Sequence, residues 1–148
     1  MISLIGKKLE ERKWILRSGA ALGADQAFEK FVKNKYIYTV KNFDFSEPNY
    51  SFCKTELLSV LDKKFSLNNY SSYCQVLLLR DINQVLGSFK TNSEHSKFLI
   101  VWTKSENYND SSTGGSRIAI RCALKYGIKV YNLVNKTTLE MIKKRLEL

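Results

Sequence analysis

The segment that most restricts the fold is the uninterrupted apolar run Phe98-Leu99-Ile100-Val101-Trp102. A run of this length suits a strand rather than a helix, since buried helices need roughly 10 or more residues. A strand that is apolar on both faces is typical of a parallel sheet covered by helices on both sides. This run therefore predicts a buried strand inside an α/β protein.

The rest of the chain alternates between strand-like and helix-like patterns. Strand patterns occupy residues 14–17, 36–40, 98–102 and 129–133. Helical periodicity covers residues 2–12, 24–34, 51–62, 74–86, 116–126 and 137–147. Such alternation is the signature of the α/β class, with a mostly parallel sheet and helices on both faces. We predict one domain over residues 1–148.

The net charge favours an anionic partner. The chain has 148 residues, with 24 lysines and arginines against 14 aspartates and glutamates, for a net charge of +10. A nucleic acid, an acidic membrane surface or a phosphorylated small molecule would each fit this excess. Lysine far outnumbers arginine, however, so codon bias of an AT-rich genome, with the charge spread over a solvated surface, is an equally good reading.

Several functional classes are disfavoured by composition. The three cysteines, Cys53, Cys74 and Cys122, are far apart and form no paired motif, which predicts a reduced, cytoplasmic protein with buried thiols. His95 is the only histidine, so no typical zinc site is expected and there is one candidate histidine base. No apolar run approaches the roughly 20 residues that span a bilayer. We expect no metal, no cofactor and no membrane partner.

Two loops rich in small residues are placed where α/β proteins bind ligands, after a strand and before a helix. The first contains Ser18, Gly19, Ala20, Gly23 and Ala24, and the second contains Thr113, Gly114, Gly115 and Ser116. Small residues allow close backbone approach, and free N–H groups at a helix start attract an anion. The pair predicts a phosphate or nucleotide cradle, although tight chain reversal without a ligand would explain either loop alone.

Polar side chains near these loops are further candidate catalytic or ligand-binding residues. Asp25 and Glu29 share one helix face, so they are the candidate catalytic carboxylates, or else a capping acid and a solvated one. Arg80, Asn83 and Gln84 also share a face and could bind a base or a phosphate, or form a polar outer surface. Arg17, Trp102 and Arg117 complete the candidate ligand-binding set; Arg117 continues into a basic stripe with Arg121 and Lys125, for which solvation is the default.

Residues 14–29, W-I-L-R-S-G-A-A-L-G-A-D-Q-A-F-E, resemble the W-x-L-R-S-G-G-A-x-G-A-D-x-A-F-E segment of phage and bacterial proteins of the SLOG superfamily. These proteins are related to the Rossmann-like domain of DNA-processing protein A and to the lysine-decarboxylase-like LOG proteins. The resemblance continues, in order and spacing, through residues 80–87, 98–103, 113–121 and 126–133. It implies a Rossmann-like fold that binds nucleotides or nucleotide-derived ligands at the two loops, often as a homo-oligomer.

Three departures from the family pattern bear on function. Relatives begin with a central strand ending in a Gly-Ser-Arg-like turn, whereas this sequence starts at the helix that follows it, so we expect either a missing first central strand or a gene start that lies downstream of the true one. Ala20 replaces a glycine, and its Cβ disfavours a positive φ. Ala119 occupies the position where the nucleotide-cleaving branch has a glutamate, which leaves no evident group to support an oxocarbenium-like transition state.

The leading expectation is therefore binding, by sensing or sequestration, of a nucleotide or nucleotide-derived ligand without catalysis. One alternative is an N-glycosidase acting on nucleoside monophosphates through Asp25 and Glu29. Another is single-stranded DNA binding, in which Tyr70, Tyr73 or Tyr108 would stack on bases. A remnant that persists as an interaction module is the last alternative. Sheet edges exposed by the missing strand favour self-association.

Overall fold

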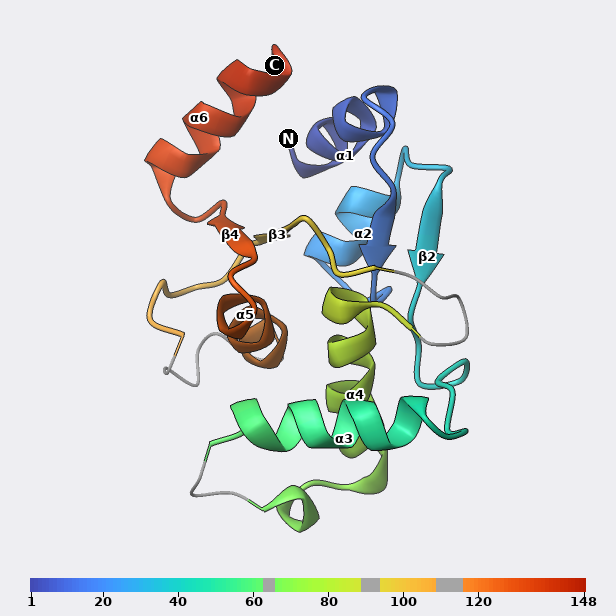
Figure 1. Cartoon of the computed structure of the whole chain (residues 1–148). Coiled ribbons are helices and arrows are strands. Elements are labelled where there is room, and N and C mark those ends of the chain that lie inside the picture. Colours follow the sequence, from blue (N-terminus) through green and yellow to red (C-terminus); the bar gives the residue numbers. More distant parts are fainter. Residues whose placement is uncertain (63–65, 89–93, 109–115) are drawn as a thin grey trace.

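The computed structural model describes residues 1–62, 66–88, 94–108 and 116–148 (Figure 1). The elements follow the order α1 (Ile2–Glu11), β1 (Leu16–Ser18), α2 (Ala24–Glu29), β2 (Lys35–Ile37), α3 (Asn49–Val60), the 3-10 helix η1 (Leu67–Asn69), α4 (Ser72–Leu86), β3 (Phe98–Val101), α5 (Ser116–Lys125), β4 (Lys129–Asn132) and α6 (Lys136–Leu146). Every predicted helix and strand is present with shifted ends, and η1 is the element that the sequence pattern did not predict. The chain is an α/β protein.

The strands pair in parallel, as predicted, but in two small sheets. β1 pairs with β2, with Leu16 opposite Lys35, and β3 pairs with β4, with Phe98 opposite Lys129. In the described part of the chain the predicted single sheet is thus two separate two-stranded sheets. Side chains, not a backbone ladder, join them: the Trp14 and Phe98 rings meet edge to face with centroids 4.9 Å apart.

The helix predicted over residues 24–34 ends at Glu29, because a side chain of α1 accepts hydrogen bonds from backbone amide groups that follow this residue. The Glu10 carboxylate of α1 accepts hydrogen bonds from the backbone N–H groups of Lys33 and Asn34, both at 2.6 Å. These backbone hydrogen bonds lower the pKa of Glu10. A tertiary contact therefore sets the end of α2, and periodicity within the segment does not.

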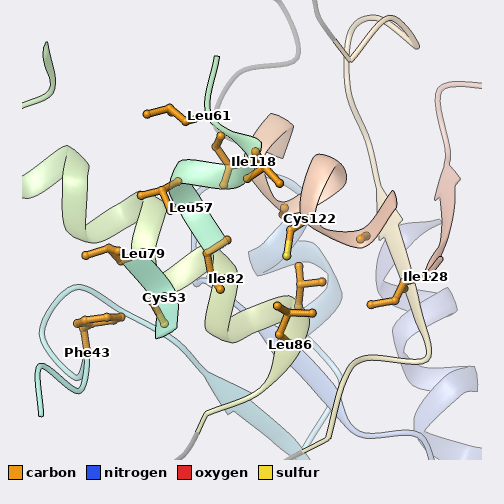
Figure 2. Close-up of a cluster of buried hydrophobic side chains, with 14 residues drawn as sticks. Phe43, Cys53, Leu57, Leu61, Leu79, Ile82, Leu86, Ile118, Cys122 and Ile128 are labelled. Carbon is orange, nitrogen blue, oxygen red and sulfur yellow. The ribbon is translucent and has the colours of Figure 1, made fainter. Parts of the chain in front are cut away.

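Buried side chains form two hydrophobic clusters. The first cluster, shown in Figure 2, lies between α3, α4 and α5 and includes Leu57, Ile82 and Cys122, all fully buried. The second cluster lies between α1, α2 and α6 and includes Ile5, Phe28 and Ile142. Figure 1 shows α1 and α6 together at the end of the molecule that also holds both chain termini.

β3 lies between the two clusters. Leu99 packs against the first cluster and Ile100 against the second, as expected when successive side chains of a strand point to opposite faces. This arrangement confirms the prediction of a strand covered on both sides. Trp102 is an exception: it follows the end of β3 and is 51% exposed, so the apolar run is one residue longer than the strand.

The basic stripe of α5 is largely an interhelical contact rather than a solvated face. Arg121 Nη1 donates to the Val60 carbonyl at 3.1 Å, and Lys125 Nζ donates to Glu56 Oε2 at 2.9 Å. Tyr126 adds a hydrogen bond from its hydroxyl to the other Glu56 oxygen. The hydrogen bonds from Tyr126 and Lys125 outweigh the cost of burial and lower the pKa of Glu56. None of the helices in the described ranges is long and apolar enough to cross a bilayer.

Candidate functional site

In the first small-residue loop, which follows β1, the carboxylate of Asp25 takes the place expected for a bound anion. Ser18 ends β1 and is buried, and its hydroxyl donates to Glu29 Oε1 at 2.6 Å. The backbone N–H groups of Gly19 and Ala21 both donate to Asp25 Oδ2, at 3.0 and 3.2 Å. The predicted cradle of unpaired amides is therefore occupied at these two positions by a side-chain carboxylate, which stabilises the loop much as a bound anion would.

Ala20 adopts the conformation that its Cβ disfavours. Its φ is 57°, in the left-handed region, and its N–H points to Ser18 Oγ at 3.4 Å. Gly23, with φ 101°, ends the loop before Ala24 opens α2. The turn keeps the shape that a glycine would allow, at the cost of backbone strain on an alanine.

The two candidate catalytic carboxylates are both engaged in hydrogen bonds of the loop. Asp25 accepts the two amides, and Glu29 accepts the Ser18 hydroxyl. Asp25 lines a cavity, described below, whereas Glu29 does not. Their hydrogen bonds account for the shape of the loop, and of the two only Asp25 also lines the cavity.

Arg80 ties the first loop to the end of β2. Its Nη1 donates to the carbonyl of Gly19 and, at 3.0 Å, to the carbonyl of Tyr38. A Cβ on Gly19 would lie 2.5 Å from this nitrogen, so a side chain at this position would have to displace the guanidinium. Asn83, another predicted ligand residue, is buried and exchanges hydrogen bonds with Asn49. Arg80 and Asn83 therefore have structural partners inside the chain.

One cavity of the described chain, cavity 1, has a volume of about 350 Å³ and lies between α1, β1 and residues 94–100. Its wall combines apolar and charged side chains. The apolar part includes Leu9, Trp14, Leu16, Phe28, Val32 and Phe98, and the polar part includes Lys13, Arg17, Ser18, Asp25, Gln84, His95 and Lys97. Arg17, Ser18 and Asp25 are thus the predicted site residues that the structure brings together.

Arg17 links β1 to the segment that precedes β3. Its guanidinium donates to the carbonyl of Glu94 and to Ser96 Oγ. His95, between these two residues, lines cavity 1 and packs its ring edge to face on Tyr126, with centroids 5.0 Å apart. The sequence analysis considered His95 only as a candidate base, and it did not predict Lys97 or Lys13 as wall residues, because a polar stretch does not show which strand it will contact.

A second cavity, cavity 2, has a volume of about 240 Å³ and lies between the end of β2 and α4. Tyr38, Arg80, Asn83 and Ser88 are among its lining residues. The face that Arg80, Asn83 and Gln84 were predicted to share is therefore split, since Gln84 lines cavity 1.

The second predicted loop falls largely outside the described residues. This applies to Thr113, Gly114 and Gly115; Ser116 is exposed at the start of α5, and Arg117 follows it, half-buried. The predicted pairing of two loops around one ligand stays a prediction. No three histidine, cysteine, aspartate or glutamate side chains in the described ranges are grouped as metal ligands.

Asp81 is a buried carboxyl that was not among the predicted site residues. It lies next to Arg80, with 3.8 Å between its Oδ1 and the arginine Nε. Burial raises the pKa of Asp81 to about 7, against the opposing effect of Arg80.

No family model, curated protein or solved structure matches the chain.

Proposed function

We propose that the protein binds a nucleotide or a nucleotide-derived phosphorylated ligand in cavity 1, without catalysis. The observation that carries the proposal is the placement of Arg17, Ser18 and Asp25 in one wall of a cavity of about 350 Å³. This volume is within the range of small-molecule sites. We also propose, from the sequence motifs described above, that the fold is Rossmann-like.

The composition of the wall suits the two chemically different parts of a nucleotide. The aromatic and aliphatic side chains around Trp14 and Phe98 offer a surface for a base. Arg17, Lys13 and Lys97 supply positive charge for a phosphate. Asp25 uses one oxygen, Oδ2, for both loop amides, so its Oδ1 is the atom that a ribose hydroxyl would meet.

Calorimetric titration with mono-, di- and cyclic nucleotides tests the proposal. We expect micromolar binding of at least one of them. Arg17→Ala should weaken it by roughly tenfold or more, the usual cost of losing a hydrogen bond to a charged group. Arg145→Ala, which removes an equal charge from the last turn of α6, is the matched control. Absence of binding by folded protein at high micromolar concentration would overturn the proposal.

Two further arms of the experiment cover the other expected activities. N-glycosidase action would release free base from a nucleoside monophosphate, and release would be lost in Asp25→Asn. Single-stranded DNA binding would show a steep dependence on salt. Tyr73, which is 62% exposed, is then the stacking residue to replace with alanine. If base release or salt-dependent DNA binding is found and no nucleotide binds in cavity 1, that activity takes the place of the proposed function.

A further inference from the structure

Cavity 1 and cavity 2 lie side by side and share one wall residue, Tyr36. No other described residue lines both cavities. Tyr36 is the middle residue of β2 and is 45% exposed. On α4 the boundary falls between consecutive residues, because Asn83 lines cavity 2 and Gln84 lines cavity 1. A ligand that passes over the ring of Tyr36 would therefore reach both cavities.

A positively charged side chain lies beside this boundary. Arg17 is opposite Tyr36 in the pairing of β1 with β2, so the two side chains lie on the same face of the sheet. The guanidinium donates hydrogen bonds to the carbonyl of Glu94 and to the hydroxyl of Ser96, and it forms no ion pair with a described residue. A phosphate group at the boundary of the two cavities would supply the negative charge that Arg17 lacks.

Cavity 2 itself suits an uncharged ring better than a second phosphate. The Nε of Arg80 and the hydroxyl of Tyr38 are shut off from the surface, so a ligand in the cavity does not reach these atoms. The more accessible polar residues of the wall are Thr39, Asn42 and Asp44, which carry a hydroxyl, an amide and a carboxylate. A carboxylate repels a phosphate but accepts hydrogen bonds from ring N–H and amino groups. This wall therefore favours a nucleobase.

We propose that the protein binds a dinucleotide, with one nucleotide in cavity 1 and the second base in cavity 2. The linking phosphate then lies near Arg17, and the ligand crosses Tyr36, whose ring offers a flat apolar surface for stacking. Cavity 2, at about 240 Å³, is smaller than cavity 1, at about 350 Å³, as expected if it holds a base without a terminal phosphate. This dinucleotide site rests on the nucleotide binding proposed above, since one half of the ligand occupies cavity 1.

Calorimetric titration of the whole chain with the dinucleotides pApA, pGpG, pCpC and pUpU, and with the four corresponding nucleoside monophosphates, tests the proposal. We expect at least one dinucleotide to bind roughly tenfold or more tightly than its monophosphate, because the second base adds contacts to a ligand that is already held. A nucleoside diphosphate adds charge without a second base, so it should not reproduce this gain. A tetranucleotide should give no further gain, because the two cavities accommodate two bases.

Substitutions at Tyr36 locate the gain in affinity at the boundary of the cavities. Within each variant the affinity for the dinucleotide is divided by that for the monophosphate, so an effect of Tyr36 on cavity 1 alone cancels. Tyr36→Ala should lower this ratio roughly tenfold, since it removes the stacking surface. Tyr36→Phe keeps the ring and should keep the ratio. Tyr73→Ala, at a tyrosine of α4 that is 62% exposed, is the matched control and should behave like the parent.

The outcomes separate this site from the function on which it rests. Binding of a monophosphate without any gain for a dinucleotide would overturn the dinucleotide site and leave the proposed function in place. A gain that a nucleoside diphosphate reproduces, that keeps rising with the length of the oligonucleotide, or that survives in Tyr36→Ala would also overturn it. If the folded protein binds neither monophosphates nor dinucleotides, the proposed function itself fails.

Discussion

At the scale of single residues, the first loop carries a strain that a substitution should relieve. Ala20 has a φ of 57°, a conformation that costs an alanine about 1 kcal/mol or more. Ala20→Gly removes this cost and adds a smaller entropic one in the unfolded chain. We expect the free energy of unfolding in urea to rise by up to about 1 kcal/mol.

Ala21 provides the control for this prediction. It is in the same loop and is exposed, but it is not among the residues with a positive φ. Ala21→Gly adds only backbone freedom, so the free energy of unfolding should fall by about 0.5 kcal/mol. If Ala20→Gly destabilises the protein as Ala21→Gly does, the loop does not hold Ala20 in the left-handed region.

The buried Asp81 makes a second prediction at this scale. Burial raises its pKa to about 7, so the folded protein holds this proton more tightly than the unfolded chain does. The contribution of Asp81 to stability is therefore lost as pH rises from about 4 toward 7, by at most about 1.4 kcal/mol per pH unit. Asp81→Asn should flatten the dependence of the unfolding free energy on pH over that range. Glu140→Gln, at an exposed position of α6, should leave it unchanged.

The residues of the candidate site show how much of it could be predicted from the sequence. Small residues and charge near strand ends identified Arg17, Ser18 and Asp25, which do line one cavity. Their bonding could not be predicted, because Asp25 and Glu29 find partners within the loop itself. Nothing local could show that the guanidinium of Arg80, far along the chain, would reach Gly19.

At the scale of elements, periodicity located the helices well, and tertiary contacts set several of their ends. α2 stops at Glu29 because Glu10 of α1 caps the amides of Lys33 and Asn34. Such a contact joins residues that are more than twenty positions apart. A pattern within residues 24–34 carries no information about it, so the prediction extended the helix too far.

The packing of α1 on α2 depends on one glycine. A Cβ at Gly6 would lie 2.7 Å from the Phe28 carbonyl oxygen and 3.2 Å from Val32 Cγ2. The first contact is with backbone, which cannot rotate away. Gly6→Ala should force the two helices apart and lower the free energy of unfolding by about 1–3 kcal/mol, despite the higher helix propensity of alanine.

The control for Gly6→Ala is Lys7→Ala on the exposed side of the same helix. It removes no buried contact and should change the free energy of unfolding by less than about 0.5 kcal/mol. Thermal or urea denaturation of both variants gives the comparison. Equal stabilities of the two variants would mean that the helices are not in close contact at Gly6.

At the scale of the whole molecule, the parallel pairing was predictable and the partition into two sheets was not. A strand pattern shows that a segment forms a strand but does not show which strand it joins. Each two-stranded sheet leaves strand edges without a ladder partner in the described chain. Unpaired edges favour association, so we expect a homo-oligomer in sedimentation equilibrium. A monomer at high micromolar concentration would contradict this expectation.

The two hydrophobic clusters should unfold together, because β3 packs against both. Leu57 is fully buried in the first cluster, and Leu57→Ala should lower the free energy of unfolding by about 2–5 kcal/mol. Leu99 and Ile100 transmit the loss, since they face opposite clusters on one strand. Hydrogen exchange in Leu57→Ala should therefore become faster in α1 and α6 as well as in α3, α4 and α5. If protection of α1 and α6 is unchanged, the second cluster is an independent unit of stability and β3 does not couple the two.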